Sequence, residues 1–268
     1  MARLAGIETV LLDLDGTLYV GSQVVPGAPE AVRWLRDQGL AVRFCTNTDS
    51  VTPAALADRL ARRGFQVAPD ELVTPVAVAA RLLAASPEAR VLAVAAGGIR
   101  RLLADHLAGP GEAVTHVLVA DPSYGATYDD LDAAFRALRG GAELLATQVN
   151  RVALRDDGEH LDTGGWVRLL EYATGRTARV LGKPSPEFFT ATLDALGRGP
   201  ETALVVGDDL EADVGGGRAV GAATVLVRSG KGDRRPSAGT GPDAVVDSVA
   251  DLPGLLRGRE RWLPDRLP

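Results

Sequence analysis

Two aspartates, Asp13 and Asp15, follow the apolar run Thr9–Leu12, and Gly16 and Thr17 come directly after them. A short continuous apolar run is typical of a buried strand in a parallel sheet, and such sheets bind ligands beyond the carboxyl ends of their strands. Two carboxylates about 4 Å apart repel by roughly 4 kcal/mol at an effective dielectric constant of about 20. A divalent cation with oxygen ligands would relieve that repulsion, although an isolated Asp-x-Asp pair also fits a polar turn.

Three further apolar runs end in polar side chains. In chain order they are Ala41–Cys45 with Thr46 and Asn47, Val180–Gly182 with Lys183, and Ala203–Gly207 with Asp208, Asp209 and Asp213. Each has an ordinary alternative: Thr46 could cap a turn, Lys183 could be a solvated surface lysine, and Asp208 could be favoured by a helix dipole. In chain order, the four strand ends supply carboxylates, a hydroxyl, an ammonium and again carboxylates. Such a series rarely arises by chance. We therefore interpret them as one catalytic site.

The same segments resemble the four motifs of the haloacid dehalogenase superfamily, and specifically of its phosphatases. The matching segments are Asp13-Leu-Asp15-Gly-Thr, Thr46-Asn47, Lys183-Pro184 and Gly207-Asp208-x4-Asp213. The stretches Arg43–Thr48, Leu170–Thr174 and Gly207–Gly217 look closest to the phospholysine phosphohistidine inorganic pyrophosphate phosphatases. The resemblance implies an α/β fold of class IIA, in which a Rossmannoid three-layer core with a parallel sheet carries a large inserted α/β cap.

The chemistry of phosphate ester hydrolysis assigns roles to the first two aspartates. A carboxylate nucleophile divides the displacement into two easier steps through an aspartyl-phosphate, and Asp13 is the candidate. Asp15 is expected to protonate the leaving oxygen as general acid and then to deprotonate the attacking water as general base. Mg²⁺ is the expected cofactor, and its ligands would be Asp13, Asp208 and the backbone carbonyl of Asp15.

The remaining polar residues are expected to bind the phosphoryl group or to support the metal. Thr46, Asn47 and the backbone amides near them can hold phosphoryl oxygens, and Lys183 can neutralise charge on the group in transfer. Asp209 and Asp213 are expected beside the metal ligands, where they would orient Lys183 or metal-bound waters.

Two alternatives to a phosphatase stay open. A binding or regulatory protein could keep this fold without turnover, but the complete set of Asp13, Asp15, Lys183 and Asp208 favours an enzyme. A dehalogenase also uses the first aspartate, but it has no leaving oxygen to protonate, so Asp15 argues against it. The expected partner is a small phosphorylated substrate, and phosphate esters, phosphoramidates and pyrophosphate are all open.

The composition is that of an ordinary globular protein. The 268 residues suggest one or two domains, and 46% are hydrophobic and 24% charged. A formal net charge of −6 argues against a nucleic-acid partner, and no run of about eighteen apolar residues is present for a membrane span. The first strand near residue 10 leaves no room for a signal peptide, and Cys45 alone cannot form an internal disulfide. We therefore expect a cytoplasmic protein.

Apolar runs alternate with helical patterns along the chain, which predicts a parallel sheet covered on both faces. Strands are expected at 8–13, 40–45, 91–95, 115–120, 143–147, 178–182, 202–207, 222–227 and 243–246. Expected helices include Ala28–Gln38, Pro53–Arg63, Tyr128–Arg139, Trp166–Thr174 and Pro186–Leu196. Residues 229–242, which are rich in glycine, arginine, serine and proline, are expected to form an exposed loop.

The spacing of the motifs predicts the domain borders. Thr46 and Lys183 must meet at one site, yet about 135 residues with their own strands and helices separate them. We therefore expect a discontinuous catalytic core, 1–76 and 179–268, interrupted by an α/β cap at 77–178. The cap would control water access and substrate choice, and a homodimer formed through it is a further expectation.

Two cap residues are candidates for substrate contact. Asn150 and Arg151 follow a predicted strand, and a related segment commonly faces the site in capped phosphatases. A polar hairpin rim is an equally good interpretation of the same segment. The family often has asparagine and serine where this chain has Thr48 and Asp49. The charge of Asp49 is unfavourable near a phosphate unless its side chain points outward.

Overall fold

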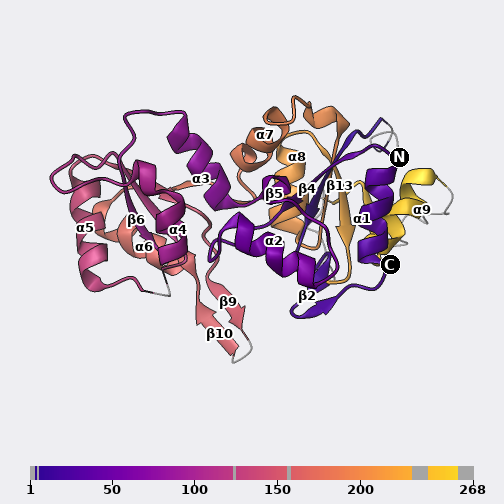
Figure 1. Cartoon of the computed structure of the whole chain (residues 1–268), viewed down its shortest axis with the longest axis horizontal. Coiled ribbons are helices and arrows are strands. Elements are labelled where there is room, and N and C mark those ends of the chain that lie inside the picture. The colour runs from indigo at the N-terminus through magenta and orange to yellow at the C-terminus, as the bar shows by residue number, and fades with distance from the viewer. Residues whose placement is uncertain (1–3, 5, 123–124, 156–157, 231–240, 259–268) are drawn as a thin grey trace. The chain divides into compact units, whose positions relative to one another are not determined.

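The computed structural model describes residues 4, 6–122, 125–155, 158–230 and 241–258 (Figure 1). The chain forms two compact units. Unit 1 comprises Met1–Thr46, Leu60–Leu72 and Phe189–Pro268, and unit 2 comprises Asn47–Arg59 and Val73–Phe188. The predicted borders of core and cap, 1–76 with 179–268 and 77–178, stay a prediction.

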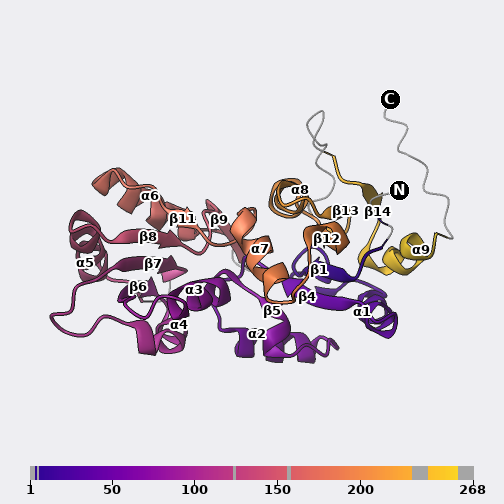
Figure 2. The same ribbon diagram turned by 90° about the horizontal axis from the view of Figure 1, so that it is seen from above.

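Unit 1 is built on a six-stranded sheet in the order β14-β13-β12-β1-β4-β5 (Figure 2). The strands are β1 (Thr9–Asp13), β4 (Ala41–Cys45), β5 (Leu72–Val73), β12 (Ala203–Gly207), β13 (Ala223–Val227) and β14 (Ala244–Val246). β1 pairs in parallel with both β4 and β12, and every residue of β1, β12 and β13 is buried. This continuous burial explains the apolar runs, because a parallel sheet is normally covered on both faces.

Short connections and helices surround this sheet. A hairpin of β2 (Tyr19–Val20) and β3 (Gln23–Val24) follows β1. Helix α1 (Ala28–Asp37) packs on β4 and on α9 (Leu252–Arg257), and α8 (Gly216–Ala219) packs on β13. The turn η6 (Leu210–Gly215) follows β12, and helices α2 (Pro53–Arg62) and α7 (Pro186–Asp194) each contain residues of both units. The expected parallel α/β fold is confirmed.

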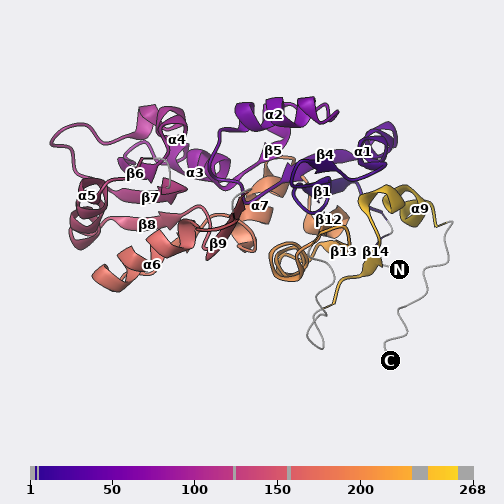
Figure 3. The same cartoon turned by 90° about the horizontal axis from the view of Figure 1, so that it is seen from below.

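Unit 2 contains a second parallel sheet in the order β11-β8-β7-β6, with β7 between β6 and β8 (Figure 3). Its elements are α3 (Pro75–Ala84), β6 (Val91–Ala95), α4 (Gly97–Leu102), β7 (His116–Ala120), α5 (Tyr128–Arg139), β8 (Glu143–Ala146), β9 (Val152–Arg155), β10 (Gly158–Leu161), α6 (Thr163–Thr174) and β11 (Arg179–Val180). Helices α5 and α6 pack on β7 and on each other. Their buried side chains, such as Leu138 and Leu170, form one apolar core with the sheet.

The predicted strands are all present, each with ends shifted by one residue or none except 178–182, which is shortened to Arg179–Val180. Helix α6 begins at Thr163 instead of Trp166, because the Asp162 carboxylate accepts a hydrogen bond of 2.7 Å from the Thr163 backbone N–H and caps the helix. Helix α3, strand β5 and the β2–β3 hairpin were not predicted, whereas the β9–β10 hairpin agrees with the alternative interpretation of the segment at Asn150 and Arg151 as a hairpin rim. The hairpin strands are too short for an alternation pattern.

Part of the predicted loop at 229–242 can be placed. Ser229, Gly230, Gly241 and Pro242 are described, whereas residues 231–240 lie outside the described part of the chain. Across the ranges that the structure describes, no helix is both long and apolar enough to cross a membrane.

Candidate active site

Three buried aspartates from unit 1 lie together at the carboxyl ends of two neighbouring strands. Asp13 is the last residue of β1, Asp208 directly follows β12, and Asp213 lies in η6. One carboxylate oxygen of each lies within 4.8 Å of the other two. The β1 and β12 strands are paired with Leu12 opposite Val206, so their ends coincide. Such a cluster of buried oxygens is the donor set that hard divalent cations prefer.

Glycines make this close approach of carboxylates possible. Gly16 has a φ of 90°, and a Cβ atom there would overlap the Asp208 carboxylate. A Cβ on Gly207 would likewise overlap the carboxylate of Asp213. A larger residue at either position would force an aspartate away from the cluster, so the glycines of both motifs have a steric reason to be there.

Hydrogen bonds orient the carboxylates of Asp13 and Asp213. The Thr17 hydroxyl donates to Oδ2 of Asp13 at 3.0 Å, and the Asp209 backbone N–H donates to Oδ2 of Asp213 at 3.2 Å. The side chain of Asp209 itself accepts from the backbone N–H groups of Glu211 and Ala212 and begins η6. Sequence reasoning assigned no role to Thr17, although its place directly after Asp-x-Asp-Gly was a signal.

Asp15 differs from the three clustered aspartates because its side chain is exposed. Its Oδ1 accepts a hydrogen bond of 3.4 Å from the Gly21 backbone N–H. The turn that carries it is held by the Ser229 hydroxyl, which donates to the Gly16 carbonyl at 2.7 Å. Ser229 comes from the predicted exposed loop and was not expected near the first motif. An exposed carboxylate can exchange protons with solvent, as a general acid and base must.

Asn47 of the second motif contacts the third motif inside unit 2. The Asn47 amide donates to the Lys183 carbonyl and accepts from the Lys183 backbone N–H, each at 2.8 Å. Thr46 and Lys183 are both buried. A Cβ on Gly182 would contact Oδ1 of Asn47 and the Thr147 carbonyl, so this glycine allows the segments to lie side by side. The strands before Thr46 and Lys183 belong to different sheets and do not pair, so the contact between the two motifs is made by Asn47.

The two cap candidates lie at the surface of unit 2. Asn150 and Arg151 are exposed and directly precede the β9–β10 hairpin, which projects from the four-stranded sheet (Figure 1). Gln148 holds the start of this segment, because its Nε2 donates to Asp162 at 2.7 Å and its Oε1 accepts from the Asn150 backbone N–H at 2.5 Å. Contact of Asn150 and Arg151 with a substrate stays a prediction.

Asp49 does not point into solvent. It is 5% exposed, and burial raises its pKa from 3.8 to about 6. Hydrogen bonds from the hydroxyls of Thr147 and Thr163 lower this pKa, and the nearby charges of Asp162 and Asp121 raise it, but both effects are smaller than that of burial. The side chain is thus enclosed by unit 2.

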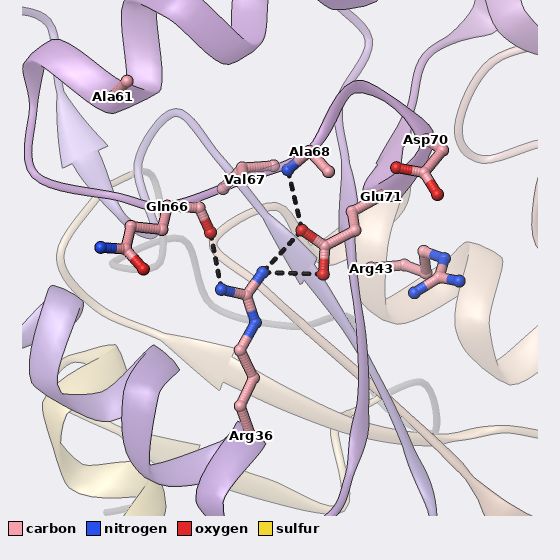
Figure 4. Close-up of a pocket in the computed structure, with 8 residues that line it drawn as sticks. All are labelled: Arg36, Arg43, Ala61, Gln66, Val67, Ala68, Asp70 and Glu71. Carbon is pink, nitrogen blue, oxygen red and sulfur yellow. Dashed lines mark hydrogen bonds and ion pairs between the residues drawn. The ribbon is translucent and has the colours of Figure 1, made fainter.

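A separate hollow of about 710 Å³ lies in unit 1 (Figure 4). An ion pair crosses it: Arg36 donates to both carboxylate oxygens of Glu71, at 2.8 and 2.7 Å, and to the Gln66 carbonyl at 2.6 Å. The residues that line it are Arg36, Arg43, Ala61, Gln66, Val67, Ala68, Asp70 and Glu71. None of the predicted site residues is among them, so this hollow is distinct from the carboxylate cluster.

Comparisons with known proteins agree with the motif pattern. A family model described as haloacid dehalogenase-like hydrolase matches residues 10–107, and one described as HAD-hydrolase-like matches residues 180–252. The phospholysine phosphohistidine inorganic pyrophosphate phosphatase of Xenopus laevis is 35% identical over 92% of each chain. The human haloacid dehalogenase-like hydrolase domain-containing protein 2 is 37% identical over 86% of this chain and 88% of its own.

Solved structures of phosphatases share the fold. The p-nitrophenyl phosphatase from Archaeoglobus fulgidus is 28% identical, with a TM-score of 0.84 over 93% of this chain and 99% of its own. A glycerol phosphate phosphatase from Mycobacterium tuberculosis, solved in complex with magnesium, is 29% identical, with a TM-score of 0.81 over 93% of this chain and 77% of its own.

Proposed function

The chain belongs to the haloacid dehalogenase-like hydrolases and is a phosphatase of that family, and we propose that it hydrolyses a small phosphorylated compound through an aspartyl-phosphate with the help of Mg²⁺. The observation that carries this proposal is the cluster of Asp13, Asp208 and Asp213. Three buried carboxylates within 4.8 Å of one another are costly unless a cation or a proton accompanies them.

The residues present fit a bound Mg²⁺. Asp13, Asp208 and the backbone carbonyl of Asp15 would hold it, and Asp213 is close enough to bind it directly or through water. When bound, the cation supplies positive charge that screens the Asp13 carboxylate from the phosphoryl group. The solved relative with magnesium supports the choice of metal.

The chemical steps belong to two aspartates of the first motif. Asp13 attacks phosphorus and forms the aspartyl-phosphate, while Asp15 donates a proton to the departing oxygen. Asp15 then takes a proton from the water that hydrolyses the intermediate, and the carboxylate of Asp13 is regenerated. Thr17, which donates to Oδ2 of Asp13, keeps the nucleophile oriented throughout.

Phosphoryl binding is proposed for the second and third motifs. The Thr46 hydroxyl and the backbone N–H of Asn47 would hold phosphoryl oxygens, because the Asn47 side chain is already bonded to the Lys183 backbone. The ammonium of Lys183 would neutralise charge on the group in transfer. Asp209 keeps its proposed supporting role through its backbone N–H, which holds Asp213.

Two further proposals concern the class of substrate and the oligomeric state. The names of the curated relatives favour a phosphoramidate or pyrophosphate alongside phosphate esters. Asn150 and Arg151 would contact the part of the substrate that leaves. We also propose a cytoplasmic homodimer formed through the cap, and sedimentation velocity that returns only a monomer at micromolar concentration would contradict the dimer.

A panel of substrates tests the proposed reaction. Alkyl and aryl phosphates, phospholysine, phosphohistidine and pyrophosphate are offered with Mg²⁺ or with EDTA, and phosphate release is measured. We expect Mg²⁺-dependent turnover that Asp13→Asn abolishes while its circular dichroism stays unchanged. Asp37→Asn, which removes an exposed carboxylate at the end of α1, is the matched control. Full activity in folded Asp13→Asn would refute the assignment, and release of halide from a haloacid would favour a dehalogenase.

A further inference from the structure

Three segments of unit 2 that are far apart in sequence converge on one oxygen of Asp49. Its Oδ2 accepts from the Thr147 hydroxyl at 2.6 Å, from the Thr163 hydroxyl at 2.9 Å and from the Asp121 backbone N–H at 3.2 Å. The three donors lie after β8, at the start of α6 and after β7. Asp121 has a φ of 24°, which is strained for a residue other than glycine and persists only where the surroundings enforce it.

The contacts of Asp49 continue to Lys183. The Thr147 carbonyl lies against Gly182, where a Cβ atom would contact it, and Gly182 directly precedes Lys183. Lys183 is in turn bonded through its backbone to the side chain of Asn47, two residues before Asp49. Asp49, Thr147, Gly182–Lys183 and Asn47 are thus linked in one closed series of contacts that includes the backbone of the proposed phosphate-binding lysine.

The same carboxylate also supports the proposed substrate segment. Thr147 is the first residue of the stretch that leads through Gln148 to Asn150, and Gln148 bonds to Asp162, the capping residue next to Thr163. Asp49 therefore supports this stretch directly through Thr147 and indirectly through Thr163, Asp162 and Gln148.

We propose that Asp49 is a positioning residue for the phosphatase reaction, and that its buried carboxylate keeps Lys183 and the segment 147–151 in their working arrangement. This inference rests on the proposed function. It gives a reason for an acidic residue at this position, where its charge beside a phosphate was expected to be unfavourable.

The arrangement depends on the proton of Asp49. The Thr147 hydroxyl has one hydrogen but two acceptors, Oδ2 of Asp49 at 2.6 Å and the Val119 carbonyl at 3.0 Å. When Asp49 is ionised, the hydrogen points to Asp49. When Asp49 is protonated, its own hydrogen can point to the Thr147 oxygen, whose hydrogen then turns to Val119. The charged groups that act on Asp49 are Asp162 before α6 and Asp121 after β7, both acidic, and its pKa of about 6 puts the change near that pH.

The test compares Asp49→Asn, Thr147→Val and Thr147→Ser with the wild type. Steady-state kcat and KM for an aryl phosphate are measured with Mg²⁺ between about pH 5 and pH 8. Asn resembles the protonated acid, so we expect kcat/KM of Asp49→Asn to be about tenfold below wild type near pH 8, and the ratio to approach one below about pH 6. Thr147→Val should show a similar loss, whereas Thr147→Ser, which keeps the hydroxyl, should stay within about twofold.

Hydrogen exchange gives a readout that does not require turnover. Asp49→Asn should speed amide exchange in peptides that cover 147–151 and 182–183, with no change in β1 and β12. Asp13→Asn, which should stop turnover, should leave exchange in those two groups of peptides unchanged. A wild type that hydrolyses nothing but shows the exchange difference would overturn the proposed reaction alone. The positioning role would be overturned if the ratio of wild-type to Asp49→Asn kcat/KM did not change with pH. It would also be overturned if amide exchange in 147–151 and 182–183 were the same in both proteins.

Discussion

Replacement of Asp208 by asparagine should make the metal-free protein more stable and remove the stabilisation by Mg²⁺. Asparagine has the shape of aspartate but no charge, so it fits against Gly16 as Asp208 does. In the wild type, Asp13, Asp208 and Asp213 place oxygens within 4.8 Å of one another. At such a separation, each pair of charges repels by roughly 3.5 kcal/mol at an effective dielectric constant of about 20.

Asp208→Asn removes two of these three pairs. Structural relaxation and solvent screening reduce the gain, so we expect the free energy of unfolding without metal to rise by about 2 to 4 kcal/mol. For a protein of this size, each kcal/mol corresponds to a melting temperature about 2 to 4 °C higher. Mg²⁺ at about 100 times its dissociation constant should stabilise the wild type by about 2.7 kcal/mol, and most of that gain should be lost in the variant.

Thermal unfolding in EDTA and in a series of Mg²⁺ concentrations measures both effects, and calorimetry gives the Mg²⁺ affinity. Asp37→Asn is the matched control, because it removes one exposed charge from α1 and should change either quantity by less than about 0.5 kcal/mol. The reasoning is refuted if metal-free Asp208→Asn is no more stable than wild type and keeps the full response to Mg²⁺.

Three further predictions use other residues. Asp15→Asn should lower kcat by about 10² to 10⁴-fold on alkyl phosphates and by less on aryl phosphates, whose leaving groups need less protonation; equal losses would indicate a structural role. Arg151→Ala should lower kcat/KM about ten- to a hundredfold on the preferred substrate but little on acetyl phosphate, with Arg176→Ala as an exposed control in unit 2. An equal drop on both substrates would contradict a role in specificity. The pKa of Asp49 is raised from 3.8 to about 6, so the folded protein binds this proton more tightly than the unfolded chain does. The free energy of unfolding should therefore fall by about 3 kcal/mol as the pH rises from below 3.8 to above about 6. Urea unfolding of Asp49→Asn should lack this decrease, and an identical pH dependence in both proteins would contradict it.

The sequence alone determined the strands of both main sheets except the two-residue β5, and the position of Asp13 and Asp208 at strand ends. This was possible because each carboxylate follows a continuous apolar run, and parallel strands present their carboxyl ends at one edge of a sheet. It also located the helix at Tyr128–Arg139, whose Thr127 cap and acidic first turn are local signals. Such features depend on residues within a few positions of one another, which a linear reading can compare.

Only the tertiary structure decided how closely the polar groups approach one another and which further groups they contact. Asp213 joins Asp13 and Asp208 because η6 bends back over Gly207, where a Cβ would exclude it. The charge of Asp49 was judged unfavourable near a phosphate unless its side chain points outward, but the side chain is buried and its hydrogen-bond partners lie 72 to 114 residues away along the chain. No local pattern records such contacts, because the energy that buries a carboxylate comes from side chains brought together by the packing of separate elements.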